Sequence, residues 1–260
     1  MFAKKSFGQN FLHDDVVIGH IVAALEPQAG ESVIEIGAGR GALTEKLLAA
    51  GFNVTAIEFE RDMIAVLKER FGSQDNFKLI EGDALSVDLA AISGSNPVKV
   101  VGNLPYNIST AILQRLITAR EHFSRIVLMF QREVAERITA KPGNSSRGFL
   151  SVIAENAFMS ERLFDVSPKA FTPTPKVWSS VVSLVPQKRQ IANESLFEKL
   201  VGIAFAQRRK TILNNLKSRM PDAGDLLSEA EVNPIRRAET LTLDEWHRLN
   251  EILVKKGRTL

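Results

Sequence analysis

The chain has 260 residues, of which 45% are hydrophobic and 24% charged, and its formal net charge is +3. It contains no cysteine, which excludes disulfides, thiolate zinc sites, iron–sulfur clusters and a cysteine nucleophile. No apolar run approaches the roughly 18 residues that span a bilayer, so we expect a cytoplasmic protein with no membrane partner.

Strand patterns alternate with helical patterns along the first part of the chain. Residues 16–25 have the apolar spacing of a helix, ended by Pro27 and Gly30. Strands that alternate with helices in this way predict a parallel sheet covered on both faces. The expected strands are 32–36, 53–58, 77–81, 99–102 and 125–130, and the expected helices between them are 42–50, 61–71 and 109–119.

The pattern changes in the second half of the chain. Residues 177–185 are rich in β-branched side chains, so we expect a late strand, antiparallel to the others, in a mixed, mostly parallel sheet. The segment 186–189 predicts a boundary between one domain of residues 1–187 and a small all-helical domain of residues 188–260. In the second domain we expect one long helix over 194–220 and another over 244–255, and residues 141–146 have the composition of a loop.

A glycine-rich turn follows the first strand of the expected sheet. Gly37, Gly39 and Gly41 lie where a strand gives way to a helix, which allows a ligand to approach the backbone closely. Two acids, Glu58 and Asp83, follow at the ends of the next two strands. Taken singly, each signal is also typical of a structural turn or a helix cap. On consecutive strands, the three together indicate a ligand site at the carboxyl edge of the sheet.

The ligand of this site is either a nicotinamide dinucleotide or S-adenosylmethionine (SAM). The glycine pattern is G-x-G-x-G rather than the G-x-G-x-x-G of dinucleotide sites. Glu35 lies two residues before the first glycine, where its carboxylate can neutralise the ammonium of a methionine moiety, a group that a dinucleotide lacks. These features favour SAM, with S-adenosylhomocysteine as product. We expect no metal, because the four histidines show no metal-ligand spacing: His13, His20, His122 and His247.

The segment Asn103-Leu104-Pro105-Tyr106 follows the fourth strand, at the same edge of the sheet. The N6 amine of adenine is a poor nucleophile, because its lone pair is delocalised into the ring, and it must be held in line with the methyl group of SAM. The Asn103 side-chain oxygen and the Leu104 carbonyl can accept its two N–H groups. Pro105 stiffens the turn, and Tyr106 offers a flat face to a flipped-out base. The motif therefore predicts methylation of adenine N6, accelerated by orientation rather than by a strong base.

The whole chain resembles the ribosomal RNA adenine dimethyltransferase family (KsgA, its eukaryotic counterpart Dim, and the Erm resistance enzymes). Five motifs carry the resemblance, at residues 7–12, 35–41, 103–106, 171–179 and 205–211. It implies a Rossmann-like SAM-dependent methyltransferase domain followed by a small helical domain. It also implies N6,N6-dimethylation of adjacent adenines near the 3′ end of small-subunit (16S) ribosomal RNA, coupled to small-subunit biogenesis. Many relatives have Gly-Pro-Gly-Leu-Gly in the SAM loop, whereas this chain has Ala38 and Arg40 at the variable positions.

The resemblance further implies roles for single residues. The segment of Gln9 and Asn10 closes over the methionine end of SAM, Asp83 and Ala84 contact its adenine, and Glu58 binds its ribose. Phe171 stacks on the face of the target base opposite Tyr106. The implied cofactor-binding residues are Gln9, Asn10, Leu12, Glu35, Gly37, Gly39, Glu58, Asp83, Ala84 and Asn103, and the implied catalytic residues are Asn103, Leu104, Pro105, Tyr106 and Phe171.

Basic residues are concentrated in the C-terminal part, where residues 188–260 hold 14 lysines and arginines against 10 acids. Residues 199–220 contain no acid and have apolar residues at helical spacing, which predicts an amphipathic helix with one basic face. We expect Arg208, Arg209 and Lys210 to contact phosphates of small-subunit ribosomal RNA in an assembling subunit, with the protein acting as a monomer.

Four other functions stay open on the sequence alone. An Erm-type enzyme would act on large-subunit RNA. A DNA adenine methyltransferase would also suit the Asn103–Tyr106 motif, although many of those have a second proline in place of Leu104. A ribosome-assembly or RNA-binding factor would keep the RNA contacts and use methylation only secondarily. A nicotinamide oxidoreductase fits least well.

Overall fold

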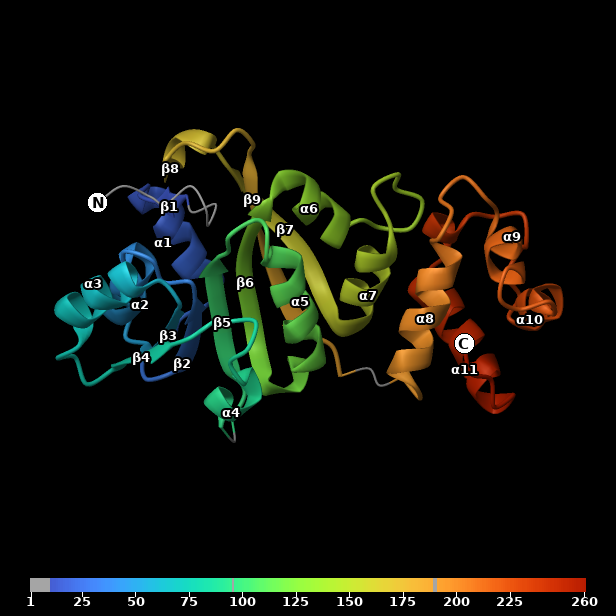
Figure 1. Ribbon diagram of the computed structural model, residues 1–260, viewed down its shortest axis with the longest axis horizontal. Helices are drawn as coiled ribbons and strands as arrows, with labels where there is room; N and C mark the ends of the chain where they lie inside the picture. Colours follow the sequence, from blue (N-terminus) through green and yellow to red (C-terminus); the bar gives the residue numbers. More distant parts are fainter. Residues whose placement is uncertain (1–9, 95, 189–190) are drawn as a thin grey trace. The chain divides into compact units, whose positions relative to one another are not determined.

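The structure is a computed structural model that describes residues 10–94, 96–188 and 191–260. Its elements group into two compact units, one reaching to Ala135 and including Phe158–Pro186, the other made of Glu136–Ala157 and Gln187–Leu260 (Figure 1). Residues 136–157 thus group with the C-terminal helices. The division into domains 1–187 and 188–260 stays a prediction. No helix among the described residues is long and apolar enough to cross a membrane.

In the described residues, the first unit is built on a seven-stranded sheet with the order β4-β3-β2-β5-β6-β9-β7. The strands from β4 to β6 pair in parallel, and β9 is antiparallel to both of its neighbours. The predicted α/β fold with a mixed, mostly parallel sheet is therefore confirmed. The strands are β2 (Ser32–Ile36), β3 (Asn53–Glu58), β4 (Phe77–Glu81), β5 (Val98–Asn103), β6 (Phe123–Gln131), β7 (Phe158–Val166) and β9 (Ser179–Pro186).

Helices α1 (Asp15–Ala24) and α2 (Ala42–Ala49) share one hydrophobic core with the sheet. Helix α1 begins where the Asp14 side chain accepts hydrogen bonds from two backbone N–H groups, which satisfies donors that have no partner within the helix. Buried residues of both helices pack against valines of the strands. The helix residues are Ile18, Ile21, Leu43 and Leu47, and the strand residues are Val33, Val54, Val101 and Val127. The other helices of the parallel part of the chain are α3 (Arg61–Phe71), α4 (Leu89–Ser93) and α5 (Ser109–Thr118).

Strand β7 was not predicted, because its sequence does not look like that of a buried strand. It carries Glu161, Arg162 and Asp165, and it lies at the edge of the sheet, where one side of the strand has no ladder partner. Its pairing with β9 is supported by a side-chain contact, since the Ser180 hydroxyl donates to Asp165 at 2.6 Å. The hydrophobic pattern does not indicate this strand, because charged residues occupy its solvent-facing positions.

A short ribbon joins the beginning of the described chain to a distant segment. Strand β1 (Phe11–Leu12) pairs antiparallel with β8 (Phe171–Thr172), so that Phe11 lies opposite Thr172 and Leu12 opposite Phe171. The N–H of His13 extends the ribbon by donating to the Ala170 carbonyl at 3.0 Å. Residues from two of the sequence motifs are thereby held side by side.

The second unit is helical, but its first long helix is not continuous as predicted. Helix α8 (Glu194–Ala204) ends, and α9 (Ile212–Lys217) begins only after a loop at 205–211. Thr211 caps α9, and the Asn215 amide donates to the carbonyls of Ala204 and Gln207, which closes the loop. These local side-chain hydrogen bonds compete with the helical ones. The remaining helices are α6 (Arg132–Ile138), which spans both units, α7 (Phe149–Ala157), α10 (Ala223–Glu229) and α11 (Leu243–Lys255).

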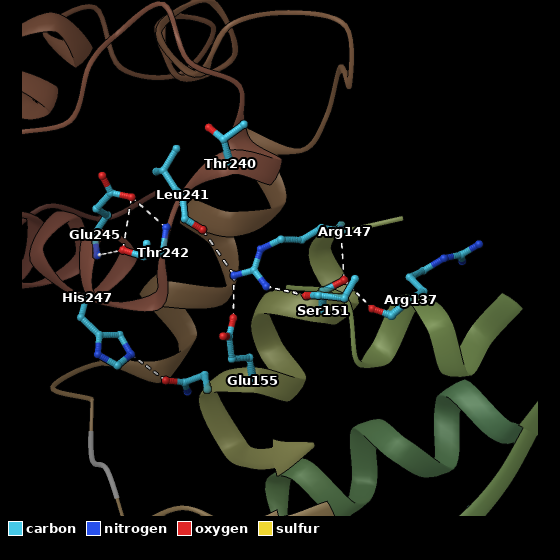
Figure 2. Close-up of polar contacts among 12 residues, drawn as sticks. Arg137, Arg147, Ser151, Glu155, Thr240, Leu241, Thr242, Glu245 and His247 are labelled. Carbon is cyan, nitrogen blue, oxygen red and sulfur yellow. Dashed lines mark hydrogen bonds and ion pairs between the residues drawn. The ribbon is translucent and has the colours of Figure 1, made fainter. Parts of the chain in front are cut away.

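A fully buried arginine ties three segments of the second unit together. Arg147 follows the predicted loop 141–146, and Figure 2 shows its guanidinium directed toward Glu155 of α7 and the carbonyl of Leu241. The guanidinium donates to Glu155 at 2.6 Å, to the Ala140 carbonyl at 2.8 Å and to the Leu241 carbonyl at 3.4 Å. A buried charge is tolerated when it is paired and hydrogen-bonded in this way.

Candidate cofactor and reaction site

A pocket lies at the carboxyl ends of β2, β3 and β5, where ligands bind in open α/β sheets. Ten of the residues proposed from sequence line it: Asn10, Leu12, Glu35, Gly37, Gly39, Glu58, Asn103, Leu104, Pro105 and Tyr106. The structure thus brings the glycine turn, the two acids of β2 and β3 and the Asn103–Tyr106 motif to one place. The other lining residues, which the sequence did not indicate as contacts, are Phe11, Ala38, Arg40, Ala42 and Leu43.

The glycine turn has the backbone that only glycine adopts easily. Gly39 has a φ of 55° and Gly41 a φ of 79°, both in the left-handed region. At Gly41 a Cβ atom would lie 2.5 Å from the ring of Phe71, so a side chain there would clash with α3. The turn leads directly into α2, whose first residues, Ala42 and Leu43, line the pocket.

Glu58 is fixed by the backbone around it. One carboxylate oxygen accepts the N–H of Gly39 at 2.8 Å, and the other accepts the N–H groups of Phe59 and Glu60, each at 2.9 Å. The side chain is 7% exposed and lines the pocket. It thus links the end of β3 to the glycine turn, and the oxygen that accepts from Gly39 has one lone pair left for a ligand.

Glu35 is a buried carboxyl group for which the described residues provide no cation. It is 1% exposed, and the Thr44 hydroxyl donates to it at 2.6 Å. Burial raises the pKa of Glu35 to about 7, and the nearby Glu58 adds to the effect, while the Thr44 hydrogen bond opposes it. Buried acids with raised pKa values are common at functional sites, where a ligand supplies the missing partner. Thr44 is a contact that the sequence gave no reason to single out.

Asn103 is oriented by the N-terminal segment. Its Nδ2 donates to the Asn10 carbonyl at 3.1 Å, which leaves Oδ1 as an acceptor at the end of β5. The Tyr106 hydroxyl lies 2.7 Å from the Ser179 hydroxyl at the start of β9, a contact that fixes the ring. Burial raises the pKa of Tyr106, so its side chain stays a neutral phenol. Ser179 is a further site residue that sequence reasoning missed, although it ends the 171–179 motif.

Arg40 stands in the glycine turn between Gly39 and Gly41. Its guanidinium lies 4.7 Å from the centre of the Phe11 ring, and a Cβ atom on Gly39 would lie 3.3 Å from the same ring. Phe11 is therefore packed against the turn on the wall of the pocket. Arg40 provides a cation–π contact with strand β1.

Not every proposed residue lines the pocket. The Asp83 carboxylate accepts the N–H of Leu85 at 2.8 Å, and the Ala84 carbonyl accepts from Arg115 at 2.8 Å. Both follow β4 and lie close to Glu58, whose carbonyl accepts the N–H of Gly82. Phe171 is 2% exposed and belongs to the hydrophobic core, and Gln9 lies outside the described residues.

The basic segment lies in the loop between α8 and α9, not on a helix face. Arg208, Arg209 and Lys210 are all exposed. The Arg208 guanidinium donates to the carbonyl of Ser145, in the 141–146 loop. No group of three or more histidine, aspartate or glutamate side chains in the described part of the chain has an arrangement that holds a metal ion.

Comparisons with known proteins agree on one kind of enzyme. A family model described as "Ribosomal RNA adenine dimethylase" matches residues 2–255. The "Ribosomal RNA small subunit methyltransferase A" of Chromohalobacter salexigens is 44% identical over 255 residues, 95% of this chain and 90% of that protein. The protein of the same name from Laribacter hongkongensis is 43% identical over 258 residues, 98% of this chain and 97% of its own length.

Two solved structures are similar over nearly the full length. A dimethyladenosine transferase from Plasmodium falciparum superposes with a TM-score of 0.82 at 27% identity, covering 95% of this chain and 98% of its own. The 23S rRNA methyltransferase ErmE superposes with a TM-score of 0.74 at 26% identity, covering 94% of this chain and 100% of its own. Both similarities include the helical unit as well as the sheet.

Proposed function

Because the chain belongs to the ribosomal RNA adenine dimethylase family, we propose that it transfers methyl groups from SAM to the N6 amines of adjacent adenines near the 3′ end of small-subunit ribosomal RNA. The observation that carries this proposal is one pocket that holds both a buried carboxyl group, Glu35, and an oriented asparagine, Asn103. The names of the curated relatives favour the small subunit over the large one.

The residues of the pocket fit SAM. Glu35 has no basic side chain bonded to it within the described residues, and the ammonium of a methionine moiety would complete it. Glu58 offers its fixed carboxylate to ribose hydroxyls, and Gly37 and Gly39 leave the backbone open to a close approach. When bound, SAM supplies a methyl group on a sulfonium centre.

The reaction motif orients the nucleophile. The Asn103 Oδ1 accepts one N–H of the adenine amine, and the Leu104 carbonyl accepts the other. Tyr106 presents its ring as a stacking face, held by Ser179, and its neutral phenol does not act as a base. The acceleration comes from holding the amine in line with the methyl group. A second turnover on the same nitrogen gives the dimethylated product.

Four further residues, Asp83, Ala84, Phe171 and Gln9, have roles that the proposal includes on the strength of the family resemblance. Asp83 and Ala84 follow β4 beside Glu58 and contact the adenine of the cofactor. Phe171 stacks on the target base opposite Tyr106, a role that requires its buried ring to be uncovered when RNA binds. Gln9, with Asn10 and Leu12, closes over the methionine end of SAM.

We propose that the RNA phosphates contact the loop between α8 and α9. Arg209 and Lys210 are exposed there, and Arg208 divides its donors between the Ser145 carbonyl and the RNA. Neutralising phosphates releases condensed counterions, so the affinity for RNA falls as salt rises. A variant in which Arg209 and Lys210 are both alanine would show a shallower salt dependence.

The proposal also includes a partner, an oligomeric state and a cellular compartment. The substrate is an assembling small ribosomal subunit in the cytoplasm, where the methylation accompanies subunit biogenesis. A monomer suffices, because one chain supplies all the residues that line the pocket. Light scattering after size exclusion tests the monomer, and fractionation of growing cells by sucrose gradient shows which ribosomal particle carries the protein.

Nucleoside mass spectrometry tests the reaction. The purified protein is incubated with SAM and, separately, with small and large subunits from cells that lack the modification, and an Asn103→Ala variant is the control. We expect dimethyladenosine in small-subunit RNA only, and only with the unmodified enzyme. Product in large-subunit RNA alone would instead assign the chain to the Erm type, and no product despite SAM binding would leave it a binding factor.

A further inference from the structure

The two tryptophans of the chain have opposite environments. Trp246 of α11 is fully buried and stacks on Phe205, with ring centres 6.0 Å apart. Trp178 is 48% exposed, and the preceding Val177 is 43% exposed. Trp246 serves the packing of the second unit, whereas the indole of Trp178 leaves about half of its surface to a partner.

The backbone of Trp178 is fixed next to the reaction motif. Its carbonyl accepts the N–H of Arg132 at 2.9 Å, where β6 gives way to α6. The next residue, Ser179, is fully buried, pairs with Gln131 of β6 and holds the Tyr106 hydroxyl at 2.7 Å. Consecutive Cα atoms are about 3.8 Å apart. An exposed aromatic ring therefore begins one residue away from the group that positions the face for the target base.

The chain segment that carries Trp178 suits a polyanion, and the nearby Asp165 of β7 forms ion pairs with Arg132 and Arg162. Residues 171–193 contain no aspartate or glutamate, and Lys176, two residues before the tryptophan, is exposed. Aromatic rings next to basic side chains are the usual elements of single-stranded RNA recognition, because bases stack on the rings while the cations contact the backbone.

Removing an adenine from its stack leaves its neighbour without a stacking partner, and this loss opposes base flipping. We propose that Trp178 stacks on the base next to the target adenine and so replaces the contact that flipping removes. The inference rests on the proposed function and adds to it a second base-binding position. Trp178 is in this view a positioning residue for the RNA, since it does not contact the reacting atoms.

The first test compares kinetic constants on small subunits that lack the modification. A Trp178→Ala variant is expected to lower kcat/KM about tenfold, mainly through KM, because stacking of one base on an aromatic ring contributes about this factor. Trp178→Phe keeps a stacking ring and is expected to restore most of the activity. The matched control Val177→Ala, an exposed apolar residue next to it, is expected to change nothing. Equal losses in Trp178→Ala and Val177→Ala would overturn the proposal in favour of a protein partner on this surface.

The second test detects stacking without turnover. Titration with single-stranded oligoadenylate is expected to quench the tryptophan fluorescence of the wild type. In Trp178→Phe only the buried Trp246 remains, and the quench should be lost. An equal quench in both proteins would refute the stacking. The kinetic test also separates the two hypotheses: a wild type that forms no dimethyladenosine refutes the proposed function, whereas a methylating wild type whose Trp178→Ala variant has unchanged kcat/KM refutes only the inference.

Discussion

Among the described residues, each unit of the molecule has a charged group that is almost completely buried, Arg147 in one and Glu35 in the other, and their surroundings are opposite. In the helical unit, Arg147 has a carboxylate partner at 2.6 Å and two backbone carbonyls as acceptors. In the sheet unit, Glu35 accepts hydrogen bonds from Thr44, and the neighbouring Glu58 raises its pKa further. Burying a charge is unfavourable unless it is paired. The paired charge therefore belongs to the structure, and the incompletely paired one marks the place that a ligand completes.

The difference predicts where mutation affects stability and where it affects function. Removing Arg147 leaves Glu155 unpaired and two carbonyls without a donor, so Arg147→Ala should lower the free energy of unfolding by about 3 kcal/mol, the lower end of the range for broken buried pairs. The lower end applies because Glu155 keeps 23% of its side chain exposed. Urea unfolding measures this value.

Two variants sharpen the Arg147 result. Arg209→Ala removes an exposed arginine and should change the unfolding free energy by less than about 0.5 kcal/mol. Replacing Arg147 and Glu155 together by methionine should recover much of the loss, because no charge is then left buried. A loss below about 1 kcal/mol in Arg147→Ala would mean that the network does not hold the helical unit together.

Asn103→Ala changes the ligand site of the sheet unit and is expected to affect activity rather than stability. It removes the proposed acceptor for the adenine amine, and we expect kcat/KM for small subunits to fall about 100-fold, as for other losses of reactant alignment. The melting temperature should shift by no more than a few degrees, because the side chain makes one hydrogen bond to the Asn10 carbonyl. Asn103→Asp, which keeps an acceptor oxygen, is the control and should be less impaired. A large loss of stability would place Asn103 with Arg147 as a structural residue.

The sequence predicts the sheet unit well for a physical reason. Its inner parallel strands β2, β3 and β5 are largely buried, so 32–36, 53–58 and 99–102 appear as apolar runs that the structure reproduces within about a residue. The residues at the ends of these strands meet at one edge whatever the details of packing. The gathering of Glu35, Glu58 and Asn103 at one pocket follows from topology alone.

The helical unit depends on contacts that sequence patterns do not show. The break at 205–211 arises from hydrogen bonds of Asn215 with carbonyls eight and eleven residues before it, and the apolar periodicity of the sequence continues through the break. Arg147 adjoins a stretch with the composition of a surface loop, and it is buried only because α7 and the Leu241 segment surround it. Sequence patterns also do not show that Phe171 is buried and Trp178 exposed, because tertiary packing decides the exposure of each ring.

The raised pKa of Glu35 gives a pH dependence with a defined sign. Below pH 7 the carboxyl of the free protein is protonated, and binding the SAM ammonium requires it to ionise. The dissociation constant for SAM should therefore rise about tenfold from pH 8 to pH 6, by linkage to a pKa of about 7. Isothermal titration at several pH values measures it.

Glu35→Gln removes this titration. Its SAM affinity should be weaker at pH 8 and should no longer vary as pH falls to 6. In the wild type, the free energy of unfolding depends on pH in the opposite direction from the affinity for SAM. Between pH 4.5, the ordinary pKa of the carboxyl, and about pH 7, the native state binds more protons than the unfolded state. The stability of the wild type therefore falls as pH rises through this window. The variant should lack that fall. A pH-independent affinity in the wild type would show that Glu35 does not contact the ammonium.

Replacing Arg40 gives the smallest expected effect. It tests whether the wall of the pocket, which does not contact the reacting groups, contributes to the affinity for SAM. Its guanidinium faces the Phe11 ring, and Phe11 lines the pocket, so Arg40→Leu loosens the wall without removing any contact to the reacting groups. An exposed cation–π contact contributes about 0.5–1 kcal/mol, which predicts a two- to fivefold weaker affinity for SAM with kcat unchanged. Arg40→Lys keeps a cation over the ring and should lie between the two. If Arg40→Leu binds SAM as tightly as the wild type, leucine packs against Phe11 equally well, and the arginine in this glycine turn is neutral for cofactor binding.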